Sequence, residues 1–249
     1  MIQPSYATGI DGCRAGWLVV RFDGQLADLQ LSLTLPAVQA DAPPPGLIFI
    51  DMPIGLLSSG PVGRTCDQLA RRYLSPLRHS SVFTPPCRAA TYTPKAAASA
   101  VNFQHTGKKL SQQSLNIVPK IRDLDEFLQQ QLPAEQLRWH EAHPEVVFAA
   151  LNHRQPLAAT KKTAAGQAQR LALLAPFFTD IAAWWPAALR QYPRSQVQPD
   201  DVLDALALAV AAWLCATGQA VLQRLPAQPP VDDTGLSMQI VFARVREFE

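Results

Sequence analysis

The sequence predicts an α/β protein in which helices flank a mixed sheet of five strands. Two observations support this fold class: short runs alternating apolar and polar residues fill the first third of the chain, and longer apolar stretches with helical spacing fill the last third. The chain has 249 residues, of which 48% are hydrophobic, so it can bury a full core. We expect residues 1–249 to form a single domain with a basic, mainly helical insertion at about residues 60–133.

Four strands are expected in the first 51 residues, and they cover residues 6–11, 16–23, 26–35 and 47–51. Short turns join the first three, which predicts an antiparallel meander. The connection to the fourth strand, PAVQADAPPPG, is long enough to cross over and place that strand parallel to the first. Both of these parallel strands end in an aspartate, Asp11 and Asp51.

The remainder of the chain is predicted to be mainly helical, with two further strands. The expected helices cover residues 66–74, 95–103, 115–132, 144–151, 166–178, 181–192 and 199–218. LRWHEA (137–142) predicts the fifth strand of the sheet, and SMQIVFARV (237–245) predicts an edge strand.

Asp11 and Asp51 are more informative together than singly. An aspartate that closes an apolar strand is costly to bury unless it is paired, hydrogen-bonded or bound to a metal ion. Each alone is often a turn-forming or capping residue. On adjacent parallel strands, however, they would lie within about 5 Å, and two such carboxylates need a cation between them or a shared proton.

Two further aspartates begin the predicted helix DDVLDALALAVAAW. A spacing of three residues puts Asp201 and Asp204 on one face of this helix. Aspartate at a helix start also caps backbone N–H groups and matches the helix dipole, a role that suits Asp200 or Asp201. Asp204 lies inside the helix and precedes a nearly uncharged stretch, so we expect it to point into buried surroundings.

The stretch HEAHPE places Glu141, His143 and Glu145 at alternate positions, which on a strand would lie on one face. If that face looks onto Asp11 and Asp51, the carboxylates are further oxygen ligands and His143 is a proton carrier or phosphate contact. The alternative interpretation is a polar face exposed to solvent.

Positive charge is concentrated in one segment of the chain. Between residues 64 and 122 there are ten basic residues and one acid, so this segment carries +9 and the rest of the chain −7, within a net charge of +2. Such a concentration is expected of a surface that binds an anion. The alternative is a solvated helical insertion rich in arginine and lysine.

The composition argues against several classes of protein. The first residues have no basic start and no long apolar run, and no later stretch reaches the roughly 18 uncharged apolar residues of a membrane span. The four cysteines are scattered without a CxxC or Cys/His pair, so neither a zinc site nor a disulfide framework is predicted. We expect a cytoplasmic protein that does not associate with a membrane.

The arrangement of the acids resembles that of the ribonuclease-H-like nucleases, with an aspartate in the first strand, an acid ending the fourth and a helix that begins D-x-x-D-A-L-A. DVLDALALA is particularly similar to the corresponding stretch of the Holliday-junction resolvases. Through GIDGCRAGW, IDMPIGL, RTCDQLARR, SSVFTPPCR, NIVPKIR, HPEVVF and DDVLDALALA, essentially the whole chain resembles family 429 among the domains of unknown function. Its members are described as predicted ribonuclease-H-like nucleases.

This resemblance implies a ribonuclease-H-like fold and a nuclease that hydrolyses phosphodiester bonds with Mg²⁺ or Mn²⁺. One or two ions would be held by Asp11, Asp51, Asp204 and Asp201, since hard cations prefer carboxylate oxygens. One ion would activate the attacking water and the other would stabilise the leaving oxygen. The catalytic set would comprise Asp11, Asp51, Asp204, Glu141, His143 and Glu145.

The same resemblance assigns the basic insertion to nucleic acid or another phosphorylated anion. The phosphate contacts would come from Arg64, Arg71, Arg88 and Lys120, which lie in or beside the family-like motifs. Binding through such contacts should weaken with added salt.

Other functions fit parts of the sequence. A non-catalytic nucleic-acid-binding or scaffold module would bind phosphate without metal dependence. An enzyme acting on a small phosphorylated substrate would use the same metal chemistry. The Gly-rich turn DGCRAG also resembles the turn that actin-like phosphotransferases use. Those enzymes, however, bind ATP between two such domains, which needs about twice the usual domain length.

Overall fold

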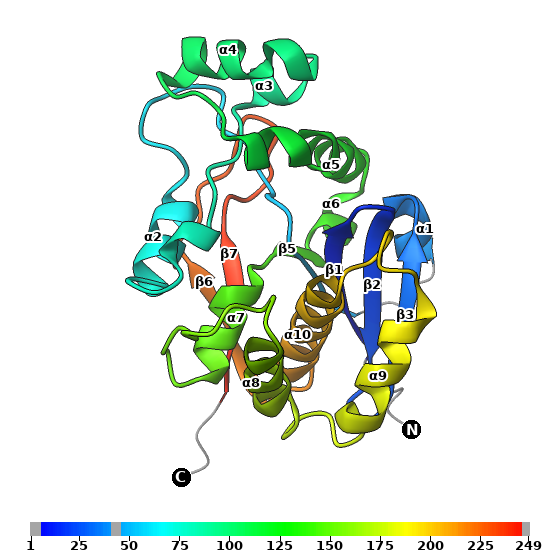
Figure 1. Ribbon diagram of the computed structural model, residues 1–249. Helices are drawn as coiled ribbons and strands as arrows, with labels where there is room; N and C mark the ends of the chain where they lie inside the picture. Colours follow the sequence, from blue (N-terminus) through cyan, green and yellow to red (C-terminus); the bar gives the residue numbers. More distant parts are fainter. Residues whose placement is uncertain (1–5, 41–45, 246–249) are drawn as a thin grey trace.

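The fold is built on a sheet of five strands in the order β3–β2–β1–β4–β5 (Figure 1). The computed structural model describes residues 6–40 and 46–245, so the middle of the Pro-rich connection and both ends of the chain lie outside the described residues. The strands are β1 (Ala7–Cys13), β2 (Gly16–Phe22), β3 (Ala27–Ser32), β4 (Ile48–Ile50) and β5 (Trp139–Glu141). β1, β2 and β3 form an antiparallel meander, and β4 and β5 continue the sheet parallel to β1. The predicted mixed sheet is confirmed.

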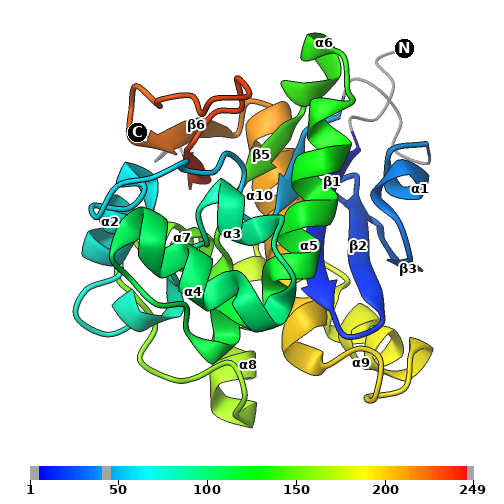
Figure 2. The same ribbon diagram turned by 90° about the horizontal axis from the view of Figure 1, so that it is seen from above.

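Helices cover both faces of this sheet (Figure 2). One face carries Ile10, Ile48 and Ile50, which belong to a core shared with α1 (Leu35–Ala40) and α5 (Gln112–Gln129). On the other face lie α7 (Pro144–Leu151), α8 (Ala164–Leu174), α9 (Ile181–Gln191) and α10 (Pro199–Ala216). Because neighbouring residues of a strand point to opposite faces, a sheet covered on both sides needs strands that are apolar throughout. This is the ribonuclease-H-like arrangement that the sequence predicts.

α10 lies directly on β1 and is the most deeply embedded helix of its layer, with residues 202–212 all buried. Gly9 permits this contact, because a Cβ atom there would lie 2.1 Å from the carbonyl oxygen of Ala205 and 2.2 Å from the amide nitrogen of Ala209. Despite the apolar composition of α10, no helix within the described residues is long and apolar enough to cross a membrane.

The segment between β4 and β5 is mainly helical. It contains α2 (Thr65–Tyr73), η1 (His79–Ser81), α3 (Arg88–Thr91), α4 (Lys95–Thr106), α5 and α6 (Pro133–Gln136). α3 and α4 lie away from the sheet, whereas α5 returns to it (Figure 1). α5 starts at Ser111, whose hydroxyl accepts a hydrogen bond from the amide of Ser114 at 3.0 Å, as a capping serine does. The helices predicted here form, together with short helical turns that the sequence did not indicate.

The last part of the described chain forms a second sheet. β6 (Ala220–Leu225) pairs antiparallel with β7 (Ile240–Val245), the strand predicted at residues 237–245. The partner of this predicted edge strand is therefore β6, although a parallel bridge between Ala142 and Val241 also joins it to the end of β5. The sequence did not indicate β6, because a run as short as AVLQRL fits a strand and a helical turn equally well.

Candidate active site

The register of β1 and β4 brings Asp11 and Asp51 side by side. Ile10 pairs with Ile50, and the amide of Asp51 donates to the carbonyl of Ile10 at 2.9 Å. The residue after each of these isoleucines is an aspartate, Asp11 inside β1 and Asp51 directly after β4. Since Ile10 and Ile50 point towards α5, the two carboxylates point to the opposite face, the side of α10. Asp11 is buried there and Asp51 is half-buried.

α10 adds Asp204 to this pair. Asp204 is 1% exposed, and its charge raises the pKa of Asp11, so the carboxylates of the helix and the strand interact directly. Asp201 lies one turn earlier, where it accepts a hydrogen bond from the amide of Gln198 at 2.8 Å. This bond closes the first turn of the helix, which is the capping role considered for Asp201. Asp201 still contributes negative charge, because it also raises the pKa of Asp11.

The cation among these aspartates is Lys161, which the sequence did not single out. It lies between α7 and α8, two residues before Thr163, the residue that caps α8. The ammonium group donates to Oδ2 of Asp204, and its charge also acts on Asp11 and Asp51, favouring their ionised forms. No signal in TKKT predicts this position, because lysine side chains are mostly exposed in proteins.

The carboxylates raise one another's pKa values. Burial raises the pKa of Asp204 to about 7, a rise that Lys161 opposes and Asp51 increases. Burial, followed by the charges of Asp51 and Asp204, raises the pKa of Asp11 well above its ordinary value. Burial also raises the pKa of Asp51. Burial alone would lower the pKa of Lys161, but the neighbouring carboxylates raise it above its ordinary value. Clustered perturbations of this kind are typical of functional sites.

Within the described residues, no group of three or more His, Cys, Asp or Glu side chains is arranged to hold a metal ion. The ammonium of Lys161 supplies the positive charge instead. One oxygen nevertheless lacks a partner: Oδ1 of Asp204 is buried and accepts no hydrogen bond. Leaving such an atom unsatisfied costs on the order of 1–3 kcal/mol, so a cation or a donor beside it would be stabilising.

His143 lies beside Asp51, and its charged form lowers the pKa of that carboxyl. The residue caps α7: its Nδ1 accepts from the amide of Glu145 at 3.2 Å, and its Nε2 lies 3.3 Å from the carbonyl oxygen of Ser81. This pattern assigns the proton of the neutral ring to Nε2, where it can donate.

Glu145 is held by a buried cation. Arg170 donates to both of its carboxylate oxygens, at 2.6 and 2.8 Å, and the side chain of Arg170 is fully buried. The charge of Glu145 reaches the site, since it raises the pKa values of Asp51 and Asp204. Its oxygens are occupied by Arg170, so the expected role as a metal ligand does not fit this geometry.

Glu141 points away from the aspartates, so the interpretation of HEAHPE as one strand face is wrong. Glu141 pairs in register with Ile50 and therefore shares the face of Ile50. On that face it accepts from Arg64 at 2.7 and 2.8 Å and from the amide of Ile54 at 2.8 Å. The strand ends at Glu141, so the assumed alternation stops before His143 is reached.

The four basic residues expected to contact phosphate are engaged within the protein. Arg64 is buried between Asp67 and Glu141, and Arg88 pairs with Asp125 and Asp232. Arg71 donates to the carbonyl of Val82 and to Thr84, and Lys120 donates to the carbonyl of Gly16 and lies over the ring of Trp17. The expected phosphate contacts do not fit these positions, because the donors already hold loops and helices together.

Comparison with known proteins places the chain in a family. No curated protein and no solved structure matches it. The model of the family described as "Protein of unknown function (DUF429)" matches residues 9–231, a range that contains the five-stranded sheet except the first two residues of β1, and also the aspartates and Lys161. The chain therefore belongs to the DUF429 family, as its motifs predict.

Proposed function

We propose that this protein is a cytoplasmic, metal-dependent hydrolase of phosphodiester bonds, a nuclease that uses Mg²⁺ or Mn²⁺. The observation that carries the proposal is that the register of β1 and β4 sets Asp11 beside Asp51, and that the buried Asp204 of α10 is close enough to interact electrostatically with both. Like charges so close are unfavourable unless a cation stabilises them.

The chemistry of the donors suits a hard divalent ion, although the described side chains are not arranged around a common ion position. Asp11, Asp51 and Asp204 offer carboxylate oxygens, the ligands that Mg²⁺ and Mn²⁺ prefer. Oδ1 of Asp204 is buried without a partner, and burial raises the pKa values of Asp11 and Asp204 even with Lys161 beside them, so a further cation would stabilise the ionised carboxylates. When bound, a divalent ion supplies Lewis acidity to a phosphoryl oxygen and to water.

The side chains around the aspartates have separate tasks in this proposal. Lys161 opposes the effect of burial on the pKa of Asp204 and so favours the ionised carboxylate that a divalent ion would need. His143 lies beside Asp51, and in its doubly protonated form it can give a proton to a leaving oxygen and return to the neutral ring, a form that requires Nδ1 to release the amide of Glu145. Arg170 holds Glu145 at the start of α7, which fixes the backbone that carries His143.

The test is cleavage of labelled DNA and RNA, single-stranded, duplex and branched, in Mn²⁺ or Mg²⁺. Wild-type protein is compared with Asp11→Asn and Asp204→Asn, and with Asp28→Asn, which changes an exposed carboxylate on the edge strand β3. Cleavage that is lost in the first two variants and kept in the third supports the proposal. Clean wild-type protein that cleaves none of these substrates contradicts it.

One observation favours a second function, a nucleic-acid-binding module without turnover. Lys161 pairs directly with Asp204, so the aspartate cluster already contains a cation from the protein itself. In that case binding of nucleic acid is independent of divalent ions and unchanged by chelation. Binding of the same labelled substrates in EDTA, without cleavage when Mn²⁺ is restored, distinguishes this function from the nuclease.

A further inference from the structure

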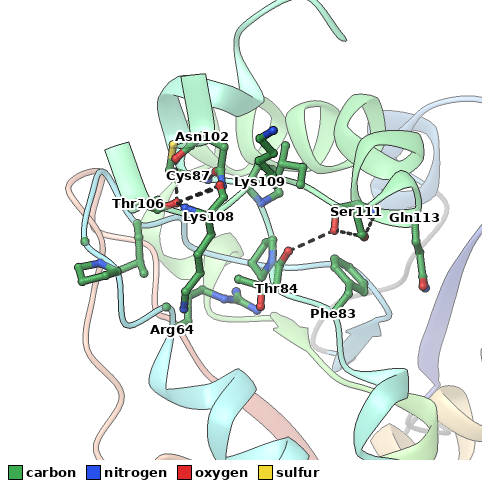
Figure 3. Close-up of a pocket in the computed structure, with 18 of the residues that line it drawn as sticks. Arg64, Phe83, Thr84, Cys87, Asn102, Thr106, Lys108, Lys109, Ser111 and Gln113 are labelled. Carbon is green, nitrogen blue, oxygen red and sulfur yellow. Dashed lines mark hydrogen bonds between the residues drawn. The ribbon is translucent and has the colours of Figure 1, made fainter. Parts of the chain in front are cut away.

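A cavity of about 370 Å³ lies in the segment between β4 and β5 (Figure 3). It is formed by the loops at residues 57–64 and 83–87 and by the turn between α4 and α5, with Lys108, Lys109 and Ser111 at that turn. Sites for small molecules and cofactors usually measure about 300–1,000 Å³, so this cavity is large enough for one.

The charge at this cavity is positive. Among the described residues that line it there is no aspartate or glutamate. Arg64 contributes little free charge, because Asp67 and Glu141 already pair with it. Lys108 and Lys109 differ from the arginines of the segment: both are exposed, and within the described residues neither side chain makes a hydrogen bond or ion pair. Two adjacent unpaired ammonium groups at the edge of a cavity favour an anion.

The remaining walls are suited to a flat ring. Phe83 is half-buried beside Pro85 and Leu110, and it presents an aromatic surface to the cavity (Figure 3). Gln113 adds an amide at the same cavity, whereas the hydroxyl of Thr106 is already hydrogen-bonded to Asn102 and to the amide of Lys108. An aromatic surface, an amide that can hydrogen-bond to a base and two cations together match a nucleotide, since bases stack on aromatic side chains and phosphates bind lysine.

The cavity adjoins the aspartate site. Phe83 and Arg64 also line a second, smaller pocket whose other walls include Asp51 and His143. Phe83 and Arg64 therefore border both spaces, which places the cavity next to the end of β4 that carries Asp51.

We propose that this cavity binds one nucleotide, with its phosphate at Lys108 and Lys109 and its base on Phe83. The nucleotide is either free or one unit of a nucleic-acid strand. This inference rests on the proposed nuclease function, because the cavity would position the substrate of that nuclease. The binding of the nucleotide itself requires neither the aspartates nor a metal ion.

Binding is measured by calorimetry in EDTA, with nucleoside monophosphates and with a short fluorescent single strand as separate probes. Lys108→Ala/Lys109→Ala should weaken binding about tenfold or more, because it removes both cations that contact the phosphate. Lys95→Ala/Arg72→Ala is the matched control, since it removes two exposed cations of the same segment that do not line the cavity. Phe83→Leu, which keeps an apolar side chain, should weaken the binding of nucleotides but not the binding of inorganic phosphate.

Each result has one meaning. Saturable binding of monophosphates with this variant pattern supports a free nucleotide, and the same pattern with the strand alone supports a nucleotide unit of a nucleic acid. Equal loss in both double variants, no effect of Phe83→Leu or no binding of either probe overturns the proposal. Binding is measured in EDTA, whereas cleavage is measured separately in Mn²⁺. If the protein binds nucleotide in EDTA but does not cleave nucleic acid in Mn²⁺, the nuclease proposal is contradicted and the nucleotide site is supported.

Discussion

Asp204 is the residue whose titration should be most visible in the stability of the protein. Its pKa is about 7 in the folded protein, mainly because of burial, and about 3.9 in an unfolded chain. Between these pH values the folded state binds more protons than the unfolded state. The contribution of Asp204 to stability therefore falls as pH rises from about 4 to 7 and stays low above that range.

Asp204→Asn should consequently stabilise the protein at pH 8, by about 1–2 kcal/mol, and should flatten the decline between pH 4 and 7. Urea unfolding at pH 5 and pH 8 measures both effects. Asp28→Asn, at an exposed carboxylate, is the control and should leave the pH dependence unchanged. A variant that is less stable than wild type at pH 8 would show that the ion pair with Lys161 outweighs the cost of burial.

Glu145 and Arg170 should matter for stability more than for chemistry. Glu145→Gln leaves the guanidinium of Arg170 charged, fully buried and without its anionic partner, which costs about 3 kcal/mol. Glu135→Gln breaks an ion pair with Arg138 that is partly exposed and should cost less than about 1 kcal/mol. Urea unfolding at pH 7 compares the two variants, and equal losses would contradict the structural role given to Arg170.

At the scale of single residues, the sequence identifies side chains whose positions depend on short-range patterns. Asp11 and Asp51 follow from strand alternation, and Asp204 follows from helical spacing. Lys161 and Arg170 could not be predicted in this way. Their partners lie 43 and 25 residues away in the sequence, and only the packing of α7 and α8 against α10 brings them together.

At the scale of elements, the contact between β1 and α10 determines where the aspartates lie. Gly9→Ala should destabilise the protein by about 3 kcal/mol or more, because the new Cβ would meet backbone atoms of Ala205 and Ala209 that cannot move aside. Gly12→Ala, on the same strand, meets the flexible side chain of Lys120 at 2.8 Å and should cost much less. Thermal unfolding of both variants checks this difference, and similar midpoints would show that α10 can shift on β1.

The elements themselves could largely be predicted, and the exceptions have physical reasons. The long helices and the five strands of the main sheet have clear apolar periodicity, and β1 to β5 form where that pattern places them. α1 and β6 are each six residues long, too short for periodicity to distinguish helix from strand. The conditional interpretation that Glu141 faces the aspartates fails because Glu141 pairs in register with Ile50 and shares its face.

At the scale of the whole molecule, only the cations without a partner inside the protein indicate where an anion could bind. The +9 of residues 64–122 suggests a phosphate-binding surface. In the fold, arginines of this segment bind carboxylates and loop carbonyls, for example Arg78 on Leu157 and Arg122 on Thr91. The exposed pair at Lys108 and Lys109 is the part of that charge with a cavity beside it.

Divalent ions should stabilise the whole molecule if the aspartates bind them. A ligand that binds only the folded state at about 100 times its Kd adds about 2.7 kcal/mol, which raises the Tm of a chain of this size by about 5–10 °C. Mn²⁺ should produce such a shift at pH 8, where Asp204 is mostly ionised, and a smaller one at pH 5.5. Differential scanning calorimetry in Mn²⁺, with Ca²⁺ and excess EDTA as comparisons, measures the effect.

Two variants test whether this rise in Tm comes from Mn²⁺ bound at the aspartates. Asp11→Asn/Asp204→Asn should abolish it, whereas Lys161→Met should enlarge it, because the substitution removes a cation that competes with the metal ion for the charge of Asp204. If the double variant keeps the full shift, Mn²⁺ binds elsewhere on the protein. If Lys161→Met loses it, the lysine does not compete with the ion but holds the carboxylates in the arrangement that binds it.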